Sequence, residues 1–221
     1  MNELYWLFGN LLCALGVALC TKAGLGMSMI AAPPYILSRF LSPFWPSLTQ
    51  GVCEYLLQAV LLVVMCLVVG RFRFKYLLSF ATAFIFGNFV DAALFVVGGS
   101  ATYTLLWQRI IAFAVGEVIT AFAIACYFRT NMPLCVYELI VVEIAERFNI
   151  ASHRVKRFYD IFMLVLSLAL SLSIFRSFVG IGIGTVIITV VNSYLIKWAG
   201  ILLDKLFDNQ PLFPRFIKLF K

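Results

Sequence analysis

The chain has little charge. Only 12% of its 221 residues are charged, whereas 63% are hydrophobic and the mean hydropathy is +1.02. A soluble domain carries about 25% charged residues, so this chain lacks the surface of a water-soluble globular protein. The net charge is +7, but the basic residues stand in short segments between apolar runs, as membrane topology signals do. We therefore expect a protein that lies in a lipid bilayer and binds no nucleic acid.

Residues and motifs that carry chemistry are also scarce. His153 is the only histidine, and the six cysteines form neither a CxxC pair nor a Cys/His cluster. Because the cysteines lie in or beside apolar runs, we interpret them as packing residues rather than as disulfides or metal ligands. The sequence has no Walker motif, no HExxH and no GxSxG. It therefore predicts no enzyme, no metal and no cofactor.

Long apolar runs dominate what remains. A membrane helix needs about 20 mostly apolar residues. Six runs meet this requirement: 4–21, 50–70, 76–98, 108–128, 158–176 and 183–203. Two further segments, 24–41 and 132–148, are apolar but broken or amphipathic. The sequence thus predicts an all-α polytopic membrane protein with about six spans, or eight if both broken segments also cross.

The basic residues predict an orientation. With six spans and a cytoplasmic N-terminus, 13 of the 17 Lys and Arg residues fall on the cytoplasmic side. Such an excess is typical of cytoplasmic loops, so we expect both termini in the cytoplasm. The segment 206–221 ends in alternating aromatic and basic residues, which favours a tail lying on the inner leaflet. A frayed tail is the alternative.

The two halves of the chain show a weak repeat. Residues 1–99 and 100–205 each contain three spans, with a broken segment after the first. A shift of about 108 residues aligns LSRF (37–40) with AERF (145–148), and a slightly shorter shift aligns Glu54 with Asp160. Three spans per repeat would make the second half enter from the opposite side. The halves would then be inverted repeats, as in many secondary transporters.

The broken segments occupy corresponding positions in the two halves. Glycine and proline disfavour a continuous helix there, and irregular backbone at membrane depth is tolerated only beside protein or a water-filled cavity. We expect short helices to start near Met27–Ser28 and Leu134–Cys135, with N–H groups aimed into a cavity where they would favour anions. A surface loop and helix lying flat are the alternative. The residues concerned are Gly24, Gly26, Ser28, Pro33, Pro34, Asn131 and Pro133.

Several polar residues lie within the apolar runs. An ionisable residue at mid-membrane costs at least about 2.5 kcal/mol, so it usually faces a bundle interior and has a function. Glu117 is the clearest example, and Asp91 shares a helix face with Asn88. We expect one polar cavity for a substrate or ion, lined by Glu117, Asp91, Asn88, Glu54, Gln58, Asn192 and Thr189. Each has a structural alternative, such as an interhelical hydrogen bond.

The stretch ALGVALCTKAGLGMSMIAAPPYILS (14–38) resembles the start of the bacterial YczE/YitT-like integral membrane proteins, in which a small-residue turn follows an apolar first helix. Residues 131–161 and the Gly-rich 180–185 are similar to corresponding segments there. Met29 stands where that pattern has a proline. The resemblance implies a bacterial inner-membrane location and, by analogy only, transport.

Two functions from different classes fit these observations. The first is a small secondary transporter or permease for a small molecule or ion, thin enough that a homodimer is expected. The second is an accessory or signalling protein that binds another membrane protein and transports nothing. A lipid-modifying or lipid-binding protein is a third, weaker alternative. A hydrated cavity at the midplane would separate the first from the second.

Overall fold

The computed structural model describes residues 2–98, 103, 105–127 and 133–206. Within these residues the chain forms eight helices. Their order repeats once, with a long, a short and then two long helices in each half. The first set is α1 (Asn2–Ala23), α2 (Ala32–Leu41), α3 (Gln50–Val69) and α4 (Lys75–Gly98). The second set is α5 (Leu106–Tyr127), α6 (Val136–Phe148), α7 (Ser152–Phe175) and α8 (Ile183–Leu206).

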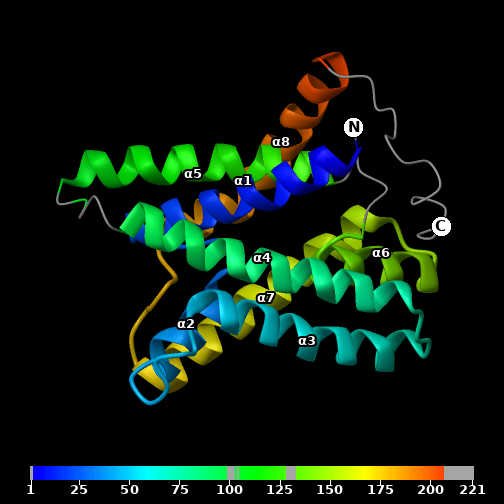
Figure 1. Cartoon of the computed structure of the whole chain (residues 1–221), viewed down its shortest axis with the longest axis horizontal. Helices are drawn as coiled ribbons and strands as arrows, with labels where there is room; N and C mark the ends of the chain where they lie inside the picture. Colours follow the sequence, from blue (N-terminus) through cyan, green and yellow to red (C-terminus); the bar gives the residue numbers. More distant parts are fainter. Residues whose placement is uncertain (1, 99–102, 104, 128–132, 207–221) are drawn as a thin grey trace.

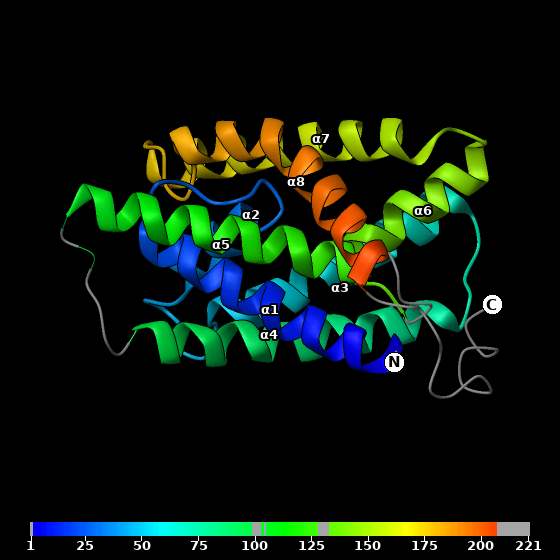
Figure 2. The same cartoon turned by 90° about the horizontal axis from the view of Figure 1, so that it is seen from above.

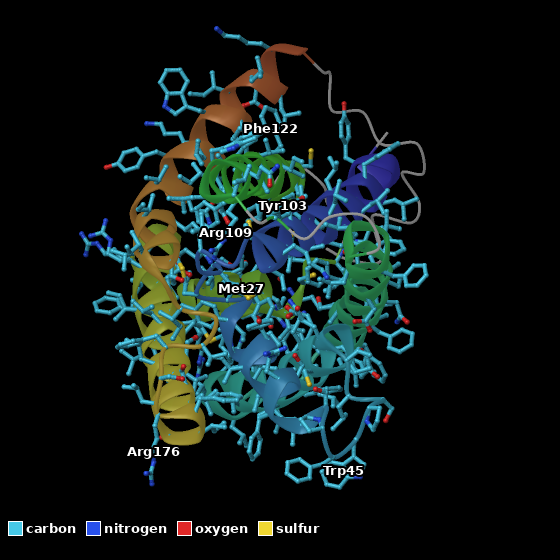
Figure 3. The ribbon with its side chains drawn as sticks, turned by 90° about the vertical axis from the view of Figure 1, so that its left-hand side faces the viewer. Met27, Trp45, Tyr103, Arg109, Phe122 and Arg176 are labelled. Atoms are coloured by element: carbon cyan, nitrogen blue, oxygen red, sulfur yellow. The ribbon has the colours of Figure 1, made fainter. Side chains whose placement is uncertain are left out.

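The six long helices cross the molecule in alternating directions (Figures 1 and 2). α1 starts at the end of the bundle marked N, and α5 runs beside it in the opposite sense. The link from α3 to α4 and the link from α6 to α7 lie at the N-terminal end. Figure 3 looks onto the other end, where Trp45, Tyr103 and Arg176 lie. The two short helices, α2 and α6, sit towards opposite ends of the bundle (Figures 1 and 2).

Length and composition make these helices compatible with a multi-pass membrane protein. Among the described residues, α1, α3, α4, α5 and α7 are long and apolar enough to cross a membrane. α8 would be a sixth span, with a bend of 52° between Ile183–Thr189 and Tyr194–Lys205. The outward faces are apolar, as lipid contact requires: on α3, Val60 and Val63 are each 60% exposed and Leu67 is 77% exposed.

The structure corrects two predicted boundaries. α2 begins at Ala32 rather than near Met27–Ser28, because Pro33 and Pro34 fit the first turn of a helix, where their missing N–H groups have no intrahelical partner to lose. α7 begins at Ser152, six residues before the predicted span, because basic residues can occupy a helix end outside the apolar core. Residues 207–221, including most of the predicted tail, lie outside the described residues.

The centre of the fold is the crossing of α1 and α5, where Gly16 and Gly116 face each other. A Cβ atom on Gly16 would lie 2.7 Å from the Gly116 carbonyl oxygen, and one on Gly116 would lie 2.9 Å from the Gly16 carbonyl oxygen. A second crossing joins α3 and α4, where Gly51 and Gly87 meet in the same way. Small residues let membrane helices approach closely, so that backbone packing replaces the missing hydrophobic drive between helices in lipid.

We expect the Gly16→Ala variant to unfold at a lower temperature than the native protein. Overpacking of this kind costs about 1–3 kcal/mol, which outweighs the gain of about 1 kcal/mol in helix propensity. Gly9→Ala is the matched control on the same helix, because its Cβ would make only an ordinary 3.4 Å contact with the Ala123 carbonyl oxygen. Thermal unfolding of both variants in detergent tests this, and equal midpoints would contradict the tight crossing.

Candidate functional site

The first broken segment, residues 24–31, leaves the end of α1 as irregular backbone. Gly24 and Gly26 have φ angles of +63° and +122°, a region that favours glycine. Arg109 of α5 closes the end of α1: its Nε donates to the Ala23 carbonyl oxygen at 2.7 Å, and its Nη2 donates to the Gly24 carbonyl oxygen at 2.6 Å. A cation at a helix C-terminus is also favoured by the helix dipole.

The Gly-rich loop between α7 and α8 covers this segment inside the protein. The Met27 N–H donates to the Gly180 carbonyl oxygen, and the Gly184 N–H donates to the Leu25 carbonyl oxygen, both at 3.0 Å. A Cβ atom on Gly182 would lie 2.3 Å from the Leu25 carbonyl oxygen, so only glycine fits this approach. Figure 3 shows Met27 near the middle of the end-on view. The segment is therefore a buried, hydrogen-bonded element rather than a surface loop.

The second broken segment enters the fold before α6. The Pro133 carbonyl oxygen accepts hydrogen bonds from Trp6 Nε1 of α1 at 3.0 Å and from Thr82 Oγ1 of α4 at 3.2 Å. The first N–H of α6, on Val136, donates to Gln58 Oε1 of α3 at 3.0 Å. The start of α6 is thus near its predicted place, but this N–H group is occupied by Gln58 and does not point into a cavity. Asn131 lies outside the described residues.

The two broken segments meet at an interior cavity of about 60 Å³. Ser28, Met29 and Ala31 line it from the first segment, and Cys135, Tyr137 and Glu138 line it from the second. The long helices complete the wall with Cys13, Val17, Glu54, Phe86, Thr120, Ile124, Tyr127, Lys156, Asn192 and Ile196. Because a water molecule needs about 10–15 Å³, the space is large enough for a few waters or a small ion.

Two carboxyl groups, of Glu54 on α3 and Glu138 on α6, line this cavity. Glu54 is 2% exposed, and its Oε2 makes no hydrogen bond in the structure. Glu138 is also buried. The cation that lines the cavity is Lys156, but its Nζ forms an ion pair with Asp160 Oδ1 at 2.8 Å. Asp160 is thus paired with Lys156, a basic residue one turn earlier on the same helix.

Glu117 lies beside this cavity rather than in it. A smaller void of about 10 Å³ touches Glu117, Cys20, Met27 and Thr120. Cys20 Sγ donates to Glu117 Oε1 at 3.4 Å, across the α1–α5 crossing. Val17, Ser28, Ala31 and Thr120 line both spaces, so the void at Glu117 adjoins the larger cavity.

The structure places Asp91 and Asn88 away from the cavity. The Asp91 carboxylate accepts hydrogen bonds from Thr49 Oγ1 and from the Gly51 N–H at the start of α3, the latter at 2.8 Å. An acid at a helix N-terminus is favoured by the unpaired N–H groups and the dipole there, so Asp91 holds α3 against α4. Asn88 is exposed, and its Nδ2 donates to the Phe84 carbonyl oxygen one turn back.

The remaining predicted residues fall near the cavity. Gln58 is fully buried and holds the start of α6. Asn192 lines the cavity, and its Oδ1 makes no hydrogen bond in the structure. Thr189 donates to the Thr185 carbonyl oxygen at 2.7 Å and lies 3.6 Å from the sulfur of Met29. Pro33 and Pro34 are buried in the first turn of α2.

Sequence reasoning missed Glu138, Tyr137 and Lys156. Glu138 lies in the segment 132–148, whose interrupted helix pattern is the more visible feature of the sequence. An ionisable residue in such a segment is itself a signal of function. Lys156 belongs to a basic stretch that was assigned to topology as a group, so its place beside the cavity was not visible in the sequence.

A second acid of α6, Glu143, anchors this helix to the start of α4. Tyr76 Oη donates to Glu143 Oε2 at 2.7 Å, and Lys75 Nζ lies 2.7 Å from Glu143 Oε1. α6 is not one of the spanning helices. Burial alone would raise the pKa of the Glu143 carboxyl, but the hydrogen bonds from Lys75 and Tyr76 and the charges of Lys75 and Arg73 outweigh burial and lower the pKa below 4.5. The ionised form is therefore the one that holds α6.

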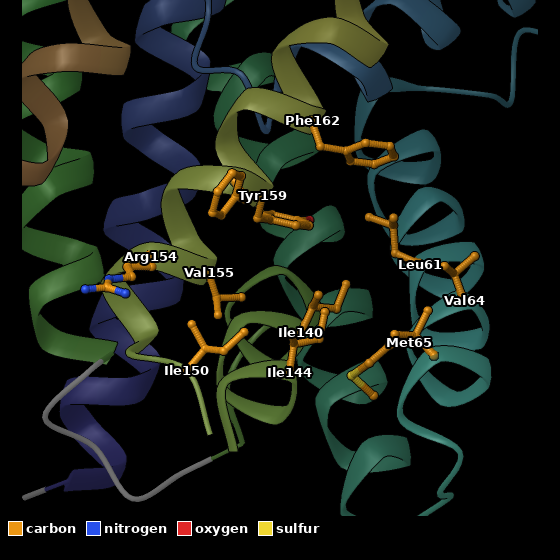
Figure 4. A pocket seen from close by; sticks show the side chains of 12 residues that line it. Leu61, Val64, Met65, Ile140, Ile144, Ile150, Arg154, Val155, Tyr159 and Phe162 are labelled. Carbon is orange, nitrogen blue, oxygen red and sulfur yellow. The ribbon is translucent and has the colours of Figure 1, made fainter. Parts of the chain in front are cut away.

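An apolar groove of about 660 Å³ opens on the other side of α6 (Figure 4). Leu61, Val64 and Met65 of α3 face Tyr159 and other side chains of α7 across it. Ile140 and Ile144 of α6 form its floor. Tyr159 and Ile140 line the groove and Tyr137 lines the cavity, and all three belong to one buried cluster, so a single packed core reaches from the groove to the cavity.

Glu143 gives the native state a defined pH dependence. Because its pKa is lowered by folding, its contribution to the free energy of unfolding is present above pH 4.5 and is lost as the pH falls through the lower folded value. Glu143→Gln should remove this acid-sensitive component. Glu146→Gln, at an exposed position of the same helix, should leave it intact. Thermal unfolding between about pH 6 and pH 3 measures both, and identical profiles would contradict the anchor.

Comparison with known proteins places this helical fold in a family. Residues 1–200 match the model of DUF6198, a family of unknown function. The chain is also 30% identical over 185 residues to the uncharacterized protein YyaS of Bacillus subtilis (strain 168). The aligned region covers 82% of this chain and 85% of that protein. No solved structure matches the chain significantly. The resemblance to YczE/YitT-like proteins stays a prediction. The chain belongs to the DUF6198 family.

Proposed function

We propose that this protein is a small secondary transporter or permease for a small molecule or ion. One observation carries the proposal: two irregular segments, which precede short helices towards opposite ends of the bundle, meet at a small cavity that the buried acids Glu54 and Glu138 line. Transporter sites are commonly built from interrupted helices near the middle of the membrane. A purely structural bundle gains nothing from placing acids and irregular backbone there, since both are costly in lipid.

The packing of the helices supports an inverted repeat as part of this proposal. In a two-fold repeat, α1 to α4 would correspond to α5 to α8 in order. The α1–α4 contact would then correspond to the α5–α8 contact, and the α2–α3 contact to the α6–α7 contact. The contact of α2 with α7 would likewise correspond to that of α6 with α3. Each of these pairs is packed in the structure, whereas the α3–α4 and α4–α6 contacts have no comparable counterpart in α7–α8 and α8–α2 among the described residues. Such an arrangement allows one half to rock against the other about a fixed central site, which is the usual basis of alternating access.

The location and orientation belong to the same proposal. Basic residues gather at the end of the bundle that holds the α3–α4 link and the α6–α7 link, including Arg71, Arg73, Arg147 and Arg154. By the positive-inside rule this end faces the cytoplasm. We place the protein in a bacterial cytoplasmic membrane with both termini on the cytoplasmic side, the location that the YczE/YitT resemblance implies.

The apolar groove favours a second function. A groove of this size between α3 and α7 would accept a helix of another membrane protein, as expected of a non-transporting accessory or signalling protein, and a second copy of the chain would cover it equally well. The two functions differ in one property. A transporter must let water and substrate reach the cavity from both sides of the membrane, whereas an accessory protein need not.

Cysteine accessibility in native membranes separates these functions. In a background without the six native cysteines, Ser28→Cys and a restored Cys135 each place one thiol on the cavity wall. A charged thiol reagent should label Ser28→Cys from the side where α2 lies and Cys135 from the opposite side. A restored Cys66, half-buried on α3 beside the apolar groove region, is the control and should stay unlabelled, because a charged reagent does not enter lipid.

Absence of labelling at both cavity positions, with the protein folded and reactive after denaturation, would overturn the transporter proposal. Labelling of both positions from one side only would contradict two-sided access. The accessory function would then be tested by co-purification and by the size of the detergent-solubilised assembly.

A further inference from the structure

Among the residues that line the cavity, several buried oxygens make no hydrogen bond in the structure, and the neighbouring Gln58 has one such nitrogen, Nε2. Glu54 is the most buried acid that faces the cavity, and its Oε2 has no hydrogen-bond partner. The Tyr137 hydroxyl, which faces the Glu54 carboxyl, and Asn192 Oδ1 also line the cavity and make no hydrogen bond of good geometry in the structure. A buried polar group without a partner is destabilising, so three such atoms around one space call for an explanation. A bound ligand that supplies positive charge to oxygens would satisfy them.

The donors at the two helix starts that were expected to bind an anion already have hydrogen-bond partners. The first N–H group of α6 donates to Gln58, and at the first broken segment the Ala31 N–H donates to Ser28 Oγ at 3.3 Å. Arg109 is committed to the end of α1. The expectation that these helix starts would attract an anion is therefore not supported by the hydrogen bonds that they make.

The charges around the cavity are unbalanced. Lys156 pairs with Asp160 at 2.8 Å. Among the described residues, neither Glu54 nor Glu138 forms an ion pair with a lysine or arginine within 4 Å. Two carboxyl groups thus face one small space with a single lysine, which interacts with Glu138 and also forms an ion pair with Asp160. Burying an uncompensated charge is costly, and a cation between these acids would offset that cost.

We infer that this cavity binds a small monovalent cation, held by the carboxylate of Glu54 with oxygens from Tyr137, Asn192 and Glu138. Such a ligand is an alkali-metal ion or a primary ammonium ion, because about 60 Å³ admits only a few heavy atoms. Across the described residues, no three His, Cys, Asp or Glu side chains are arranged to hold a metal ion. That arrangement disfavours a transition metal, which prefers several nitrogen or sulfur ligands.

This inference rests on the proposed function, for which it names the substrate or coupling-ion class. A transported cation needs a site that releases it, and one unpartnered carboxylate with neutral oxygens gives weaker binding than a closed cage of acids. Glu138 lies on α6, one of the two short helices, whereas Glu54 lies on the long helix α3. Movement of α6 relative to α3 would therefore change the distance between the two acids and the affinity for the cation.

Thermal unfolding of the purified protein in lipid nanodiscs tests this inference. Sodium, potassium and methylammonium chlorides are each compared with choline chloride at the same ionic strength, since choline is too large for the cavity. A cation that binds the native state should raise the unfolding midpoint by about 3–6 °C for each tenfold increase in concentration above its Kd. The three salts distinguish an alkali-metal ion from an organic ammonium ion.

Variants locate the effect. Glu54→Gln keeps the size of the side chain but removes its charge, so it should abolish the cation-dependent shift. Glu138→Gln should weaken it. Glu146→Gln, which removes a charge from an exposed position of α6, should keep the full shift. If Glu54→Gln does not fold, Glu54→Asp replaces it and should change the order of preference among the three cations, because the carboxylate is withdrawn by one carbon.

Two results would overturn the inference: unfolding in all three salts at the same midpoint as in choline chloride, or a full shift that persists in Glu54→Gln. Neither result bears on labelling of the cavity from two sides. Two-sided labelling without a cation effect would leave a transporter of another substrate class. A cation effect without two-sided labelling would leave a binding site in a protein that does not transport.

Discussion

Irregular backbone in a membrane must find hydrogen-bond partners inside the protein, and the arrangement of this fold follows from that requirement. Residues 24–31 find theirs in the Gly-rich loop before α8, where Leu25 and Met27 exchange backbone hydrogen bonds with Gly184 and Gly180. Arg109 covers the carbonyl oxygens at the end of α1. The second broken segment finds its partners in Trp6, Thr82 and Gln58. In each case, residues of one half of the chain supply hydrogen-bond partners for irregular backbone in the other half.

This mutual dependence explains why the cavity lies where it does. Each broken segment is held by elements of the opposite half, so both are drawn to the centre of the bundle. The close crossing of α1 and α5 through Gly16 and Gly116 brings the two halves together there. Irregular backbone packs less completely than two helices do, and the remaining space is bounded by Ser28, Glu54 and Glu138. The cavity is thus a consequence of how the chain satisfies its backbone.

Polar residues in the helices divide into two kinds. Asp91 completes a helix start, and Glu143 ties α6 to α4, so each is explained by the fold itself. Gln58 belongs to both kinds, because its Oε1 holds the start of α6 while its Nε2 makes no hydrogen bond. Glu54 and Asn192 have polar atoms that the fold leaves without hydrogen bonds. Both lie on the cavity wall. Because evolution rarely retains an unsatisfied buried acid without a use, this division separates structural residues from candidates for binding.

The sequence by itself determined the class of the fold and its main elements. Low charge and long apolar runs predicted the long helices to within a few residues. A helix is favoured in lipid because it satisfies its backbone hydrogen bonds within one segment. Glycines and prolines marked both interruptions, because their effect on the backbone is local. Only the tertiary structure decided which acids share a space. Glu117, Asp91 and Asn88 were predicted to meet, yet Asp91 caps α3 and Asn88 faces outward. In a membrane helix the lipid-facing side and the core-facing side are equally apolar, so spacing shows which residues share a face but not which face turns inward.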